Sequence, residues 1–299
     1  MKNTEKTIKD IKEILILGAG TLGLRIGLQA AISGFKVIIY DVSEDALSKA
    51  KDTQSGILKG LIKHGKLDAD RMSSVQSAIS WTTDLAFACK NPDLVSESVP
   101  EDLAIKKKVW QQVGALCPEK TLFTTNTSYM LSSWMAEETG RPELFCAFHF
   151  HDVFFANVVD IMPHAQTADW FPKLLEELGM VLNQTPVHVE KESTGYIFNA
   201  MLLSLLGTAG HLVTSGLCSP EDVDKSWIGN FKMEMGPFGI MDNIGLDTVW
   251  HVTKERKDEK SKRFAAYIKN FVDSGKLGVK TGEGFYTYPH PSYKEMLKE

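Results

Sequence analysis

The sequence predicts an α/β protein in which a doubly wound sheet is followed by an all-α domain. Two observations predict this architecture. Short apolar runs alternate with helical patterns as far as about Pro186, which is typical of parallel strands joined by crossover helices. From Thr194 to Leu217 the pattern indicates one long, largely apolar helix, and further helical patterns follow it. We therefore expect two domains, at residues 1–189 and 190–299, which suits a length of 299 residues.

The first strand leads into a glycine-rich turn. The apolar run Ile14–Leu17 indicates a buried strand, and it continues into Gly18-x-Gly20-x-x-Gly23 and then a helical pattern. In dinucleotide-binding turns, the first glycine makes the bend and the second lets the backbone approach a pyrophosphate. The third lets helix and strand pack closely, and the phosphates lie at the helix N-terminus. The order of strand, turn and helix predicts a Rossmann-type domain.

An acid follows the second expected strand. Residues 36–40 are the strand, and Asp41 comes directly after it. A carboxylate at this place accepts hydrogen bonds from the ribose hydroxyls of NAD and repels the 2′-phosphate of NADP. Since no arginine follows closely, we expect NAD as the cofactor. The alternative is that Asp41 merely ends the strand.

Composition narrows the class of protein. The chain is 43% hydrophobic and 24% charged, as is usual for globular proteins, and its net charge of −5 disfavours nucleic acid and anionic membranes as partners. No apolar window approaches the ~18 residues of a membrane span. The cysteines, which are Cys89, Cys117, Cys146 and Cys218, lack CxxC spacing. We therefore expect no metal site, no disulfide framework and a cytoplasmic location.

Polar side chains follow several of the expected strands. The strands near residues 93–95, 121–125 and 145–148 lead to Glu97 and Glu101, to Asn126 and Ser128, and to His149. Ligands of open α/β sheets bind beyond the carboxyl ends of the strands, so these groups are expected to line one site. Ser128 has a second interpretation, as the cap of a helix beginning near Leu131, and Asn126 has one as a turn residue.

A histidine at this edge suits proton transfer. Imidazole accepts a hydroxyl proton at neutral pH, and a carboxylate on its other nitrogen fixes the tautomer. His149 is the favoured base. His151 is its rival, because residues i and i+2 of an extended segment point to the same face. Asn199, in a leucine-rich helix, requires a partner, which is either a ligand or a second subunit.

Several motifs together resemble the L-3-hydroxyacyl-CoA dehydrogenase family from end to end. They are residues 18–23, 96–103, 126–128, 149–150, 195–199, 236–238 with Asp242, 245–247, and the closing Gly-Lys-Leu-Gly…Gly-Glu-Gly-Phe-Tyr. The resemblance implies an NAD domain joined to a helical domain that forms a homodimer. The apolar run 196–206 also favours a homodimer, because an apolar helix suits a subunit interface. It implies that His149 is the catalytic base and that Ser128 and Asn199 contact the reacting oxygen. The implied NAD-binding residues are Gly18, Gly20, Thr21, Leu22, Gly23, Asp41, Glu101, Lys106 and Asn126.

Two departures from the family pattern concern the histidine. Family members usually carry His-Phe-Phe-Asn-Pro, whereas this chain has His149-Phe150-His151-Asp152-Val153. The expected glutamate partner of the histidine falls on Asp160 only if one residue is deleted. Asp152 is the other candidate partner, but we favour Asp160, because Val158–Met162 indicates a strand that would hold its acid rigidly. In this region the chain is more similar to the diketoreductase branch, with the L-gulonate dehydrogenase branch as a further relative.

The resemblance implies an NAD-dependent enzyme that interconverts a short-chain 3-hydroxyacyl-CoA and the 3-ketoacyl-CoA. The alternative is a dehydrogenase or reductase of free 3-hydroxy acids, 3-keto acids or diketo compounds. A non-catalytic NAD-binding protein is disfavoured by the combination of Ser128, His149 and Asn199. A serine hydrolase is disfavoured because no G-x-S-x-G elbow occurs. Hydroxyacid dehydrogenases with a catalytic lysine carry Gly-x-x-x-Asn-Lys, whereas Ala200 follows Asn199 here.

Overall fold

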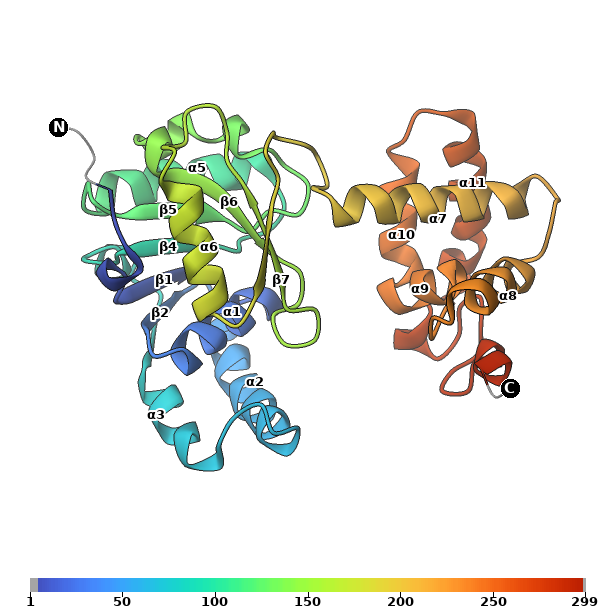
Figure 1. Cartoon of the computed structure of the whole chain (residues 1–299), viewed down its shortest axis with the longest axis horizontal. Helices are drawn as coiled ribbons and strands as arrows, with labels where there is room; N and C mark the ends of the chain where they lie inside the picture. Colours follow the sequence, from blue (N-terminus) through green and yellow to red (C-terminus); the bar gives the residue numbers. More distant parts are fainter. Residues whose placement is uncertain (1–4, 298–299) are drawn as a thin grey trace. The chain divides into compact units, whose positions relative to one another are not determined.

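The computed structural model describes residues 5–297, which divide into two compact units (Figure 1). The first unit ends at Ile197 and holds the sheet, and the second begins at Phe198 and is helical. The α/β fold class with a helical second part is therefore confirmed. The division comes later than residue 189 because the connecting segment stays with the sheet. Tyr196 there is buried in a cluster with Ala147 and Met162.

Within residues 5–297 the first unit contains a sheet of eight strands in the order β3-β2-β1-β4-β5-β6-β7-β8. All neighbouring pairs are parallel except β6–β7. The strand order reverses beside β1, and this switch point is where doubly wound sheets bind ligands. The strands are β1 (Glu13–Leu17), β2 (Lys36–Tyr40), β3 (Ile79–Thr82), β4 (Leu94–Glu97), β5 (Leu122–Thr125), β6 (Phe145–Phe150), β7 (Val158–Met162) and β8 (Thr185–His188).

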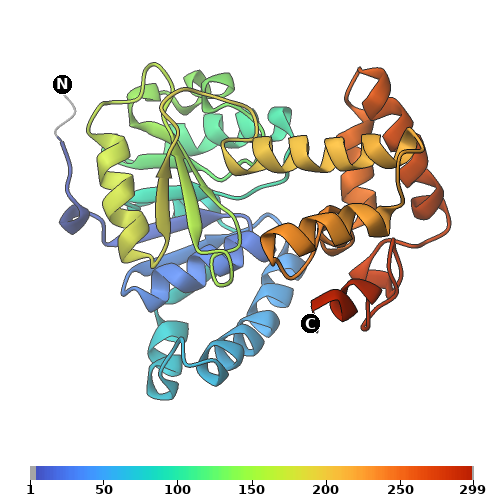
Figure 2. The ribbon, with the colours of Figure 1, turned by 45° about the vertical axis from the view of Figure 1, so that its right-hand side comes forward.

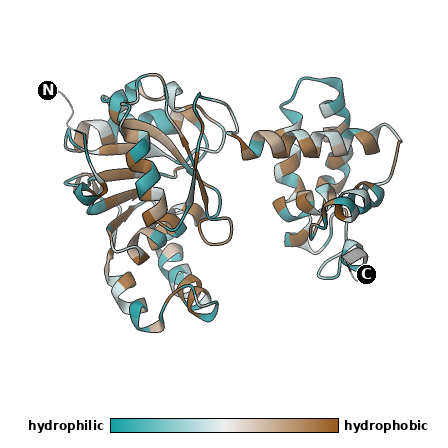
Figure 3. Cartoon of the chain, viewed as in Figure 1, coloured by the Kyte–Doolittle hydropathy of each residue, from teal (hydrophilic) through white to brown (hydrophobic). Residues whose placement is uncertain are grey.

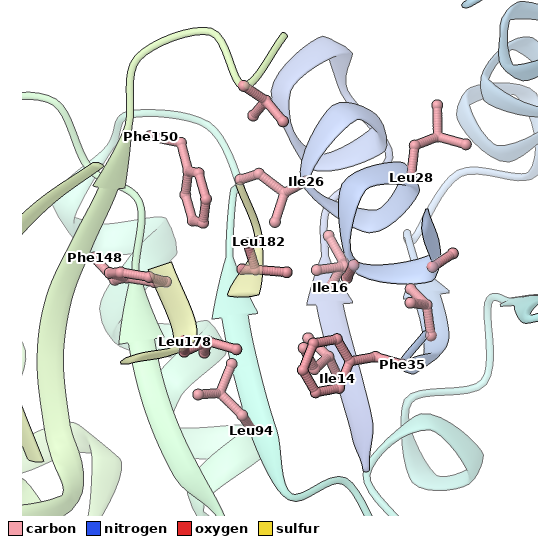
Figure 4. Close-up of a cluster of buried hydrophobic side chains, with 14 of the residues drawn as sticks. Ile14, Ile16, Ile26, Leu28, Phe35, Leu94, Phe148, Phe150, Leu178 and Leu182 are labelled. Carbon is pink, nitrogen blue, oxygen red and sulfur yellow. The ribbon is translucent and has the colours of Figure 1, made fainter. Parts of the chain in front are cut away.

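Helices cover both faces of the sheet. They are α1 (Thr21–Ile32), α2 (Glu44–Lys63), α3 (Met72–Ser77), α4 (Leu85–Ala88), α5 (Leu103–Leu116) and α6 (Phe171–Val181). In Figure 1, α6 lies in front of the sheet and α5 behind it, and Figure 2 shows the same ribbon turned by 45°. Strand β1 feeds two cores, because alternate side chains point to opposite faces. Ile14 and Ile16 join the core under α1 and α6 (Figure 4), whereas Leu15 and Leu17 join the core under α5, with Trp110.

Local sequence explains where these helices begin. The Ser43 hydroxyl accepts a hydrogen bond from the Ala46 backbone N–H at 3.2 Å at the start of α2, as its capping position predicts. Asp102 caps α5 in the same way, through the backbone N–H of Ile105 at 2.9 Å. The helix that Ser128 was a candidate to cap is only a 3-10 turn, Ser132–Trp134, and its N-cap residue is Leu131. Ser128 is therefore not a helix cap.

The second unit is a helical bundle. Its helices are α7 (Phe198–Thr214), α8 (Pro220–Phe231), α9 (Pro237–Ile244), α10 (Leu246–Lys254) and α11 (Glu259–Asp273). Helix α7 begins at Phe198 rather than at Thr194, because Gly195 and Tyr196 have φ angles of 79° and 53°, which no right-handed helix contains. Short 3-10 helices elsewhere are Ile8–Asp10, Ala69–Arg71, Glu137–Thr139, Pro142–Leu144, Val279–Thr281 and Ser292–Leu297.

Two buried aspartates fix the interior of the second unit. Asp224 accepts hydrogen bonds from the backbone N–H groups of Phe238 and Gly239, each at 2.9 Å, in the first turn of α9. Asp242 accepts from the N–H groups of Phe285 and Tyr286, each at 2.9 Å, and so fastens the closing glycine-rich loop to α9. Burial raises the pKa of both carboxyls despite these hydrogen bonds.

Across residues 5–297, the helices all fall short of the length and apolarity that crossing a bilayer requires.

Candidate active site

The turn between β1 and α1 requires glycine at two positions. Gly18 has a φ of +102°, and a Cβ added there would lie 2.6 Å from the backbone oxygen of Ser98. A Cβ added at Gly23 would lie 2.1 Å from the oxygen of Gly18, so α1 packs closely on the turn. At Gly20, in contrast, no atom lies within 4 Å of an added Cβ. The turn is thus closed on the protein side and open where a pyrophosphate approaches the backbone.

Asp41 is fastened to this turn. Its Oδ2 accepts a hydrogen bond from the backbone N–H of Ala19 at 2.8 Å, and its Oδ1 accepts one from the N–H of Ser43 at 2.9 Å. Thr21 and Leu22 form the first turn of α1 on the other side. An acid at the end of β2, next to the glycine turn, is the arrangement that receives an adenosine ribose. These residues therefore fit a bound NAD.

A buried lysine joins two glutamates at the carboxyl end of β4. The Lys106 side chain is 1% exposed, and its Nζ lies 2.6 Å from Glu97 Oε1 and 3.3 Å from Glu101 Oε2. Glu97 also accepts the Thr125 hydroxyl at 2.6 Å, so this buried charge is paired and hydrogen-bonded. The other oxygen of Glu101 accepts the backbone N–H of Ser128 at 3.1 Å. Glu101 and Lys106 therefore position the loop that carries Ser128.

Asn126 connects the ends of two strands. Its side-chain oxygen accepts the backbone N–H of Phe150 at 2.7 Å, which joins the end of β5 to the end of β6. This contact agrees with the interpretation of Asn126 as a structural residue of the turn. Its expected contact to the cofactor stays a prediction.

His149 and Asp160 face each other across β6 and β7. They are directly paired in the antiparallel register, and Nδ1 of His149 lies 3.0 Å from Oδ2 of Asp160. The sequence pattern predicted that His149 follows its strand, but β6 extends to Phe150 because β7 pairs with it. A carboxylate only accepts, so Nδ1 carries the proton and Nε2 keeps a free lone pair. That Nε2 lies 3.2 Å from the Ser128 hydroxyl, which donates to it.

His151 shares the same carboxylate oxygen. Its Nε2 lies 3.0 Å from Asp160 Oδ2, as the spacing of two residues along a strand predicts. Burial by itself raises the pKa of Asp160, but the hydrogen bonds from His149 and His151 outweigh burial and hold that pKa below its usual value. Asp160 is therefore ionised throughout the neutral range.

Tyr196 is a site residue that the motif search missed. Its ring stacks on the His149 imidazole, with centroids 4.7 Å apart and planes 18° from parallel, and its hydroxyl donates to the Thr127 carbonyl at 2.8 Å. Burial, followed by the charge of Asp160, raises the pKa of Tyr196 well above its usual value. Tyr196 thus stays neutral and orients the imidazole. The available signal was its place inside the matched stretch 195–199.

Asp152, the rival partner of the histidine, makes other contacts. Its carboxylate forms an ion pair with Arg25 on α1 and accepts the backbone N–H of Phe155 at 3.1 Å. Asp152 therefore shapes the β6–β7 loop.

Asn199 lies on α7 of the second unit and is half-buried. Its expected contact to the reacting oxygen stays a prediction.

Comparison with known proteins identifies the family. Two models match the chain, namely 3-hydroxyacyl-CoA dehydrogenase, NAD binding domain, at residues 13–193, and 3-hydroxyacyl-CoA dehydrogenase, C-terminal domain, at residues 195–288. The mitochondrial hydroxyacyl-coenzyme A dehydrogenase of Rattus norvegicus is 31% identical over 93% of this chain and 91% of its own length. A probable 3-hydroxybutyryl-CoA dehydrogenase of Deinococcus radiodurans is 32% identical over 91% of this chain and 99% of its own length.

A solved structure of a diketoreductase is also similar to this chain. It has a TM-score of 0.87 and 37% sequence identity, and the match covers 93% of this chain and 99% of that one. The two domain models and the named relatives indicate the same family, and the glycine turn fits its NAD-binding domain. The chain therefore belongs to the 3-hydroxyacyl-CoA dehydrogenase family of NAD-dependent oxidoreductases.

Proposed function

We propose that this protein is an NAD-dependent 3-hydroxyacyl-CoA dehydrogenase that interconverts a short-chain 3-hydroxyacyl-CoA and the 3-ketoacyl-CoA. The observation that carries the proposal is the Ser128–His149–Asp160 chain of hydrogen bonds at the carboxyl end of the sheet. The substrate class is taken from the names of two relatives, the hydroxyacyl-coenzyme A dehydrogenase of Rattus norvegicus and the probable 3-hydroxybutyryl-CoA dehydrogenase of Deinococcus radiodurans. Such a reaction is a step of fatty acid metabolism.

The cofactor is held by the first part of the chain. The glycine turn at residues 18–23 receives the pyrophosphate, and Asp41 receives the adenosine ribose. When bound, NAD accepts the hydride that leaves the hydroxyl-bearing carbon of the substrate and returns it in the reverse direction.

His149 moves the proton that accompanies this hydride. Its Nε2 accepts the proton of the substrate hydroxyl, while Nδ1–H stays on the Asp160 carboxylate. The ionised carboxylate stabilises the imidazolium that results. In the reverse direction Nε2–H returns the proton to the ketone oxygen. No other side chain has to change its protonation state.

Ser128 marks where the substrate oxygen binds. Its hydroxyl donates to His149 Nε2. During proton transfer the substrate hydroxyl takes over this hydrogen bond to Nε2, so it has to bind next to Ser128. The Ser128 hydroxyl can then donate to the substrate oxygen instead. Because the Glu101 carboxylate holds the backbone N–H of Ser128, this hydroxyl is fixed relative to the sheet.

A second candidate function is the reduction of free diketo or 3-keto compounds that carry no CoA. The observation that favours it is the 37% identity to the diketoreductase structure, which exceeds the identity to the hydroxyacyl-CoA enzymes. Both candidates use the same proton transfer by His149 and differ only in what binds the remainder of the substrate.

One assay separates the two candidates. Purified protein is given NADH with acetoacetyl-CoA, and in parallel with acetoacetate, an acetoacetate ester and a dicarbonyl compound. We expect the highest kcat/KM for acetoacetyl-CoA. A higher kcat/KM for the free ketones would assign the protein to the diketoreductase type, and no NADH oxidation with any of them would refute the proposed enzyme.

The second unit is proposed to form a homodimer, and the protein to be cytoplasmic. Phe198 and Met201 on α7 are 50% and 61% exposed, and much of this helix is apolar (Figure 3). Apolar side chains gathered on one helix are typical of a subunit interface.

The proposed cytoplasmic location rests on the cysteines. Cys89, Cys117, Cys146 and Cys218 are free thiols, which suits a reducing compartment.

A further inference from the structure

Three metal-binding side chains converge in the core of the site. His149, His151 and Asp160 each offer one ligand atom, and these atoms all lie within 4.8 Å of one another. Both imidazoles point a nitrogen at the same oxygen, Asp160 Oδ2, at 3.0 Å. The proton transfer described above needs only His149 and Asp160. His151 helps to hold the pKa of Asp160 low through its hydrogen bond, but it does not itself move the proton.

We propose that this trio binds a divalent transition-metal ion, Zn²⁺ above all, and that the ion inhibits the enzyme. Two imidazole nitrogens and one carboxylate oxygen are a ligand set that Zn²⁺ prefers, and three protein ligands leave a fourth position for water. Ligand atoms of a tetrahedral Zn²⁺ lie about 3.3 Å apart. The two 3.0 Å contacts therefore have to widen by a few tenths of an ångström, and the two imidazole nitrogens, which lie within 4.8 Å of each other, have to reach the same spacing.

His151 makes this a binding site. Without His151, only His149 and Asp160 supply ligands. Catalytic zinc sites in proteins have three protein ligands, and two ligands bind Zn²⁺ more weakly. The His151 side chain is also the most accessible of the trio, with 12% of its surface exposed against 4% for His149 and 2% for Asp160. An ion entering from solvent therefore meets His151 first.

Inhibition follows from the tautomer of His149, and this step rests on the proposed function. Zn²⁺ bound at Nδ1 takes the lone pair of that nitrogen, so the imidazole proton moves to Nε2. Nε2 is the atom that faces Ser128 and accepts the proton of the alcohol. Once it carries a proton, it cannot accept another. The ion also takes Oδ2 of Asp160 away from the imidazole.

The test measures metal binding and activity separately. Metal-free protein is titrated with Co²⁺, whose visible absorption reports tetrahedral nitrogen and oxygen ligands, and with Zn²⁺ by calorimetry. The ligand variants are His151→Phe and His151→Gln. The matched control is His188→Gln, because His188 also has Nε2 next to a carboxylate, Glu176 Oε2 at 3.1 Å, but at the surface. Circular dichroism checks that each variant is folded.

We expect one ion per wild-type chain, unchanged binding in His188→Gln, and binding weakened by at least ~10–100-fold in both His151 variants. Saturating Zn²⁺ should lower the turnover of wild type by ~10²–10⁴-fold, as loss of the base does, and chelation should restore it. The activity that remains in His151→Phe should resist Zn²⁺.

Two results would overturn the proposal. One is a wild-type protein that binds no Co²⁺ or Zn²⁺ at micromolar concentration, and the other is binding of equal strength in the His151 variants. Both readouts are independent of turnover. If no substrate is converted, the proposed function fails, whereas the titrations still decide whether the metal site exists.

Discussion

His149 and Asp160 occupy paired positions on antiparallel strands, and their side chains meet at 3.0 Å through Nδ1 and Oδ2. The pairing is rigid because it rests on the β6–β7 register. It leaves Nε2 of His149 as the acceptor nitrogen next to Ser128. The expected behaviour of several variants follows from this relationship.

Removing the base should have the largest effect. His149→Gln is expected to lower kcat by ~10²–10⁴-fold, the usual contribution of a positioned acid–base group, while the affinity for NADH stays nearly unchanged. His151→Gln should lose much less, because His149 still has its carboxylate. Steady-state kinetics and NADH fluorescence titration measure both quantities. If the two variants show the reverse order, His151 is the base.

The carboxylate should matter through the tautomer it imposes. Asp160→Asn keeps the shape but offers an amide in place of an acceptor-only carboxylate, so Nδ1–H is no longer favoured. A loss of up to ~10⁴-fold in kcat is expected, as in other histidine–carboxylate pairs. Asp152→Asn is the matched control, because Asp152 pairs with Arg25 instead of the histidine. Near-normal kcat in Asp160→Asn together with a collapse in Asp152→Asn would transfer the role to Asp152.

Cofactor choice should depend on Asp41. Asp41→Ala removes the carboxylate that we propose to receive the ribose hydroxyls of NAD and to repel a 2′-phosphate. The ratio of kcat/KM for NADH to that for NADPH is therefore expected to fall, chiefly through a higher KM for NADH. Asp45→Ala, a few residues farther on, serves as the control for loss of one nearby charge. NADH kinetics that do not change in Asp41→Ala would contradict the assignment.

Stability should respond to acid through Asp160. The folded protein holds the pKa of Asp160 below its usual value, so the ionised carboxylate stabilises the fold above the unfolded-state pKa of about 3.9. This contribution is lost as pH falls through the lower, folded-state pKa. Wild type should therefore exceed Asp160→Asn in free energy of unfolding near neutrality, and the difference should shrink from about pH 5 downward. Urea unfolding at several pH values measures it, and a difference independent of pH would contradict it.

The oligomeric state should depend on α7. We expect sedimentation at micromolar concentration to show a dimer, because obligate interfaces are large and apolar. Met201→Lys, which places a charge on the exposed apolar part of α7, should shift the distribution toward monomer. Met180→Lys, at an exposed position of α6 in the first unit, is the control for the same change elsewhere on the chain. A wild-type protein that sediments only as a monomer would refute the dimer.

The order of local patterns was enough to predict the Rossmann-type domain. The strand Ile14–Leu17 and the glycine turn at residues 18–23 depend on residues adjacent in the chain. Such short-range preferences are written directly in the sequence. The choice of His149 rests on its place after an expected strand together with the family resemblance. The preference for Asp160 over Asp152 rests on the family's glutamate, which falls on Asp160, and on the strand pattern of Val158–Met162.

Only the tertiary structure decided which of these side chains meet. The β6–β7 register brings Asp160 to both His149 and His151, and an ion pair across to α1 takes Asp152 away from them. Tyr196 reaches the imidazole because Gly195 and Tyr196 adopt left-handed backbone angles, which delay the start of α7. Periodicity shows which residues share a face of one strand, but it does not show which strand lies opposite. Contacts between residues far apart in the chain depend on register and packing, and these are properties of the whole fold.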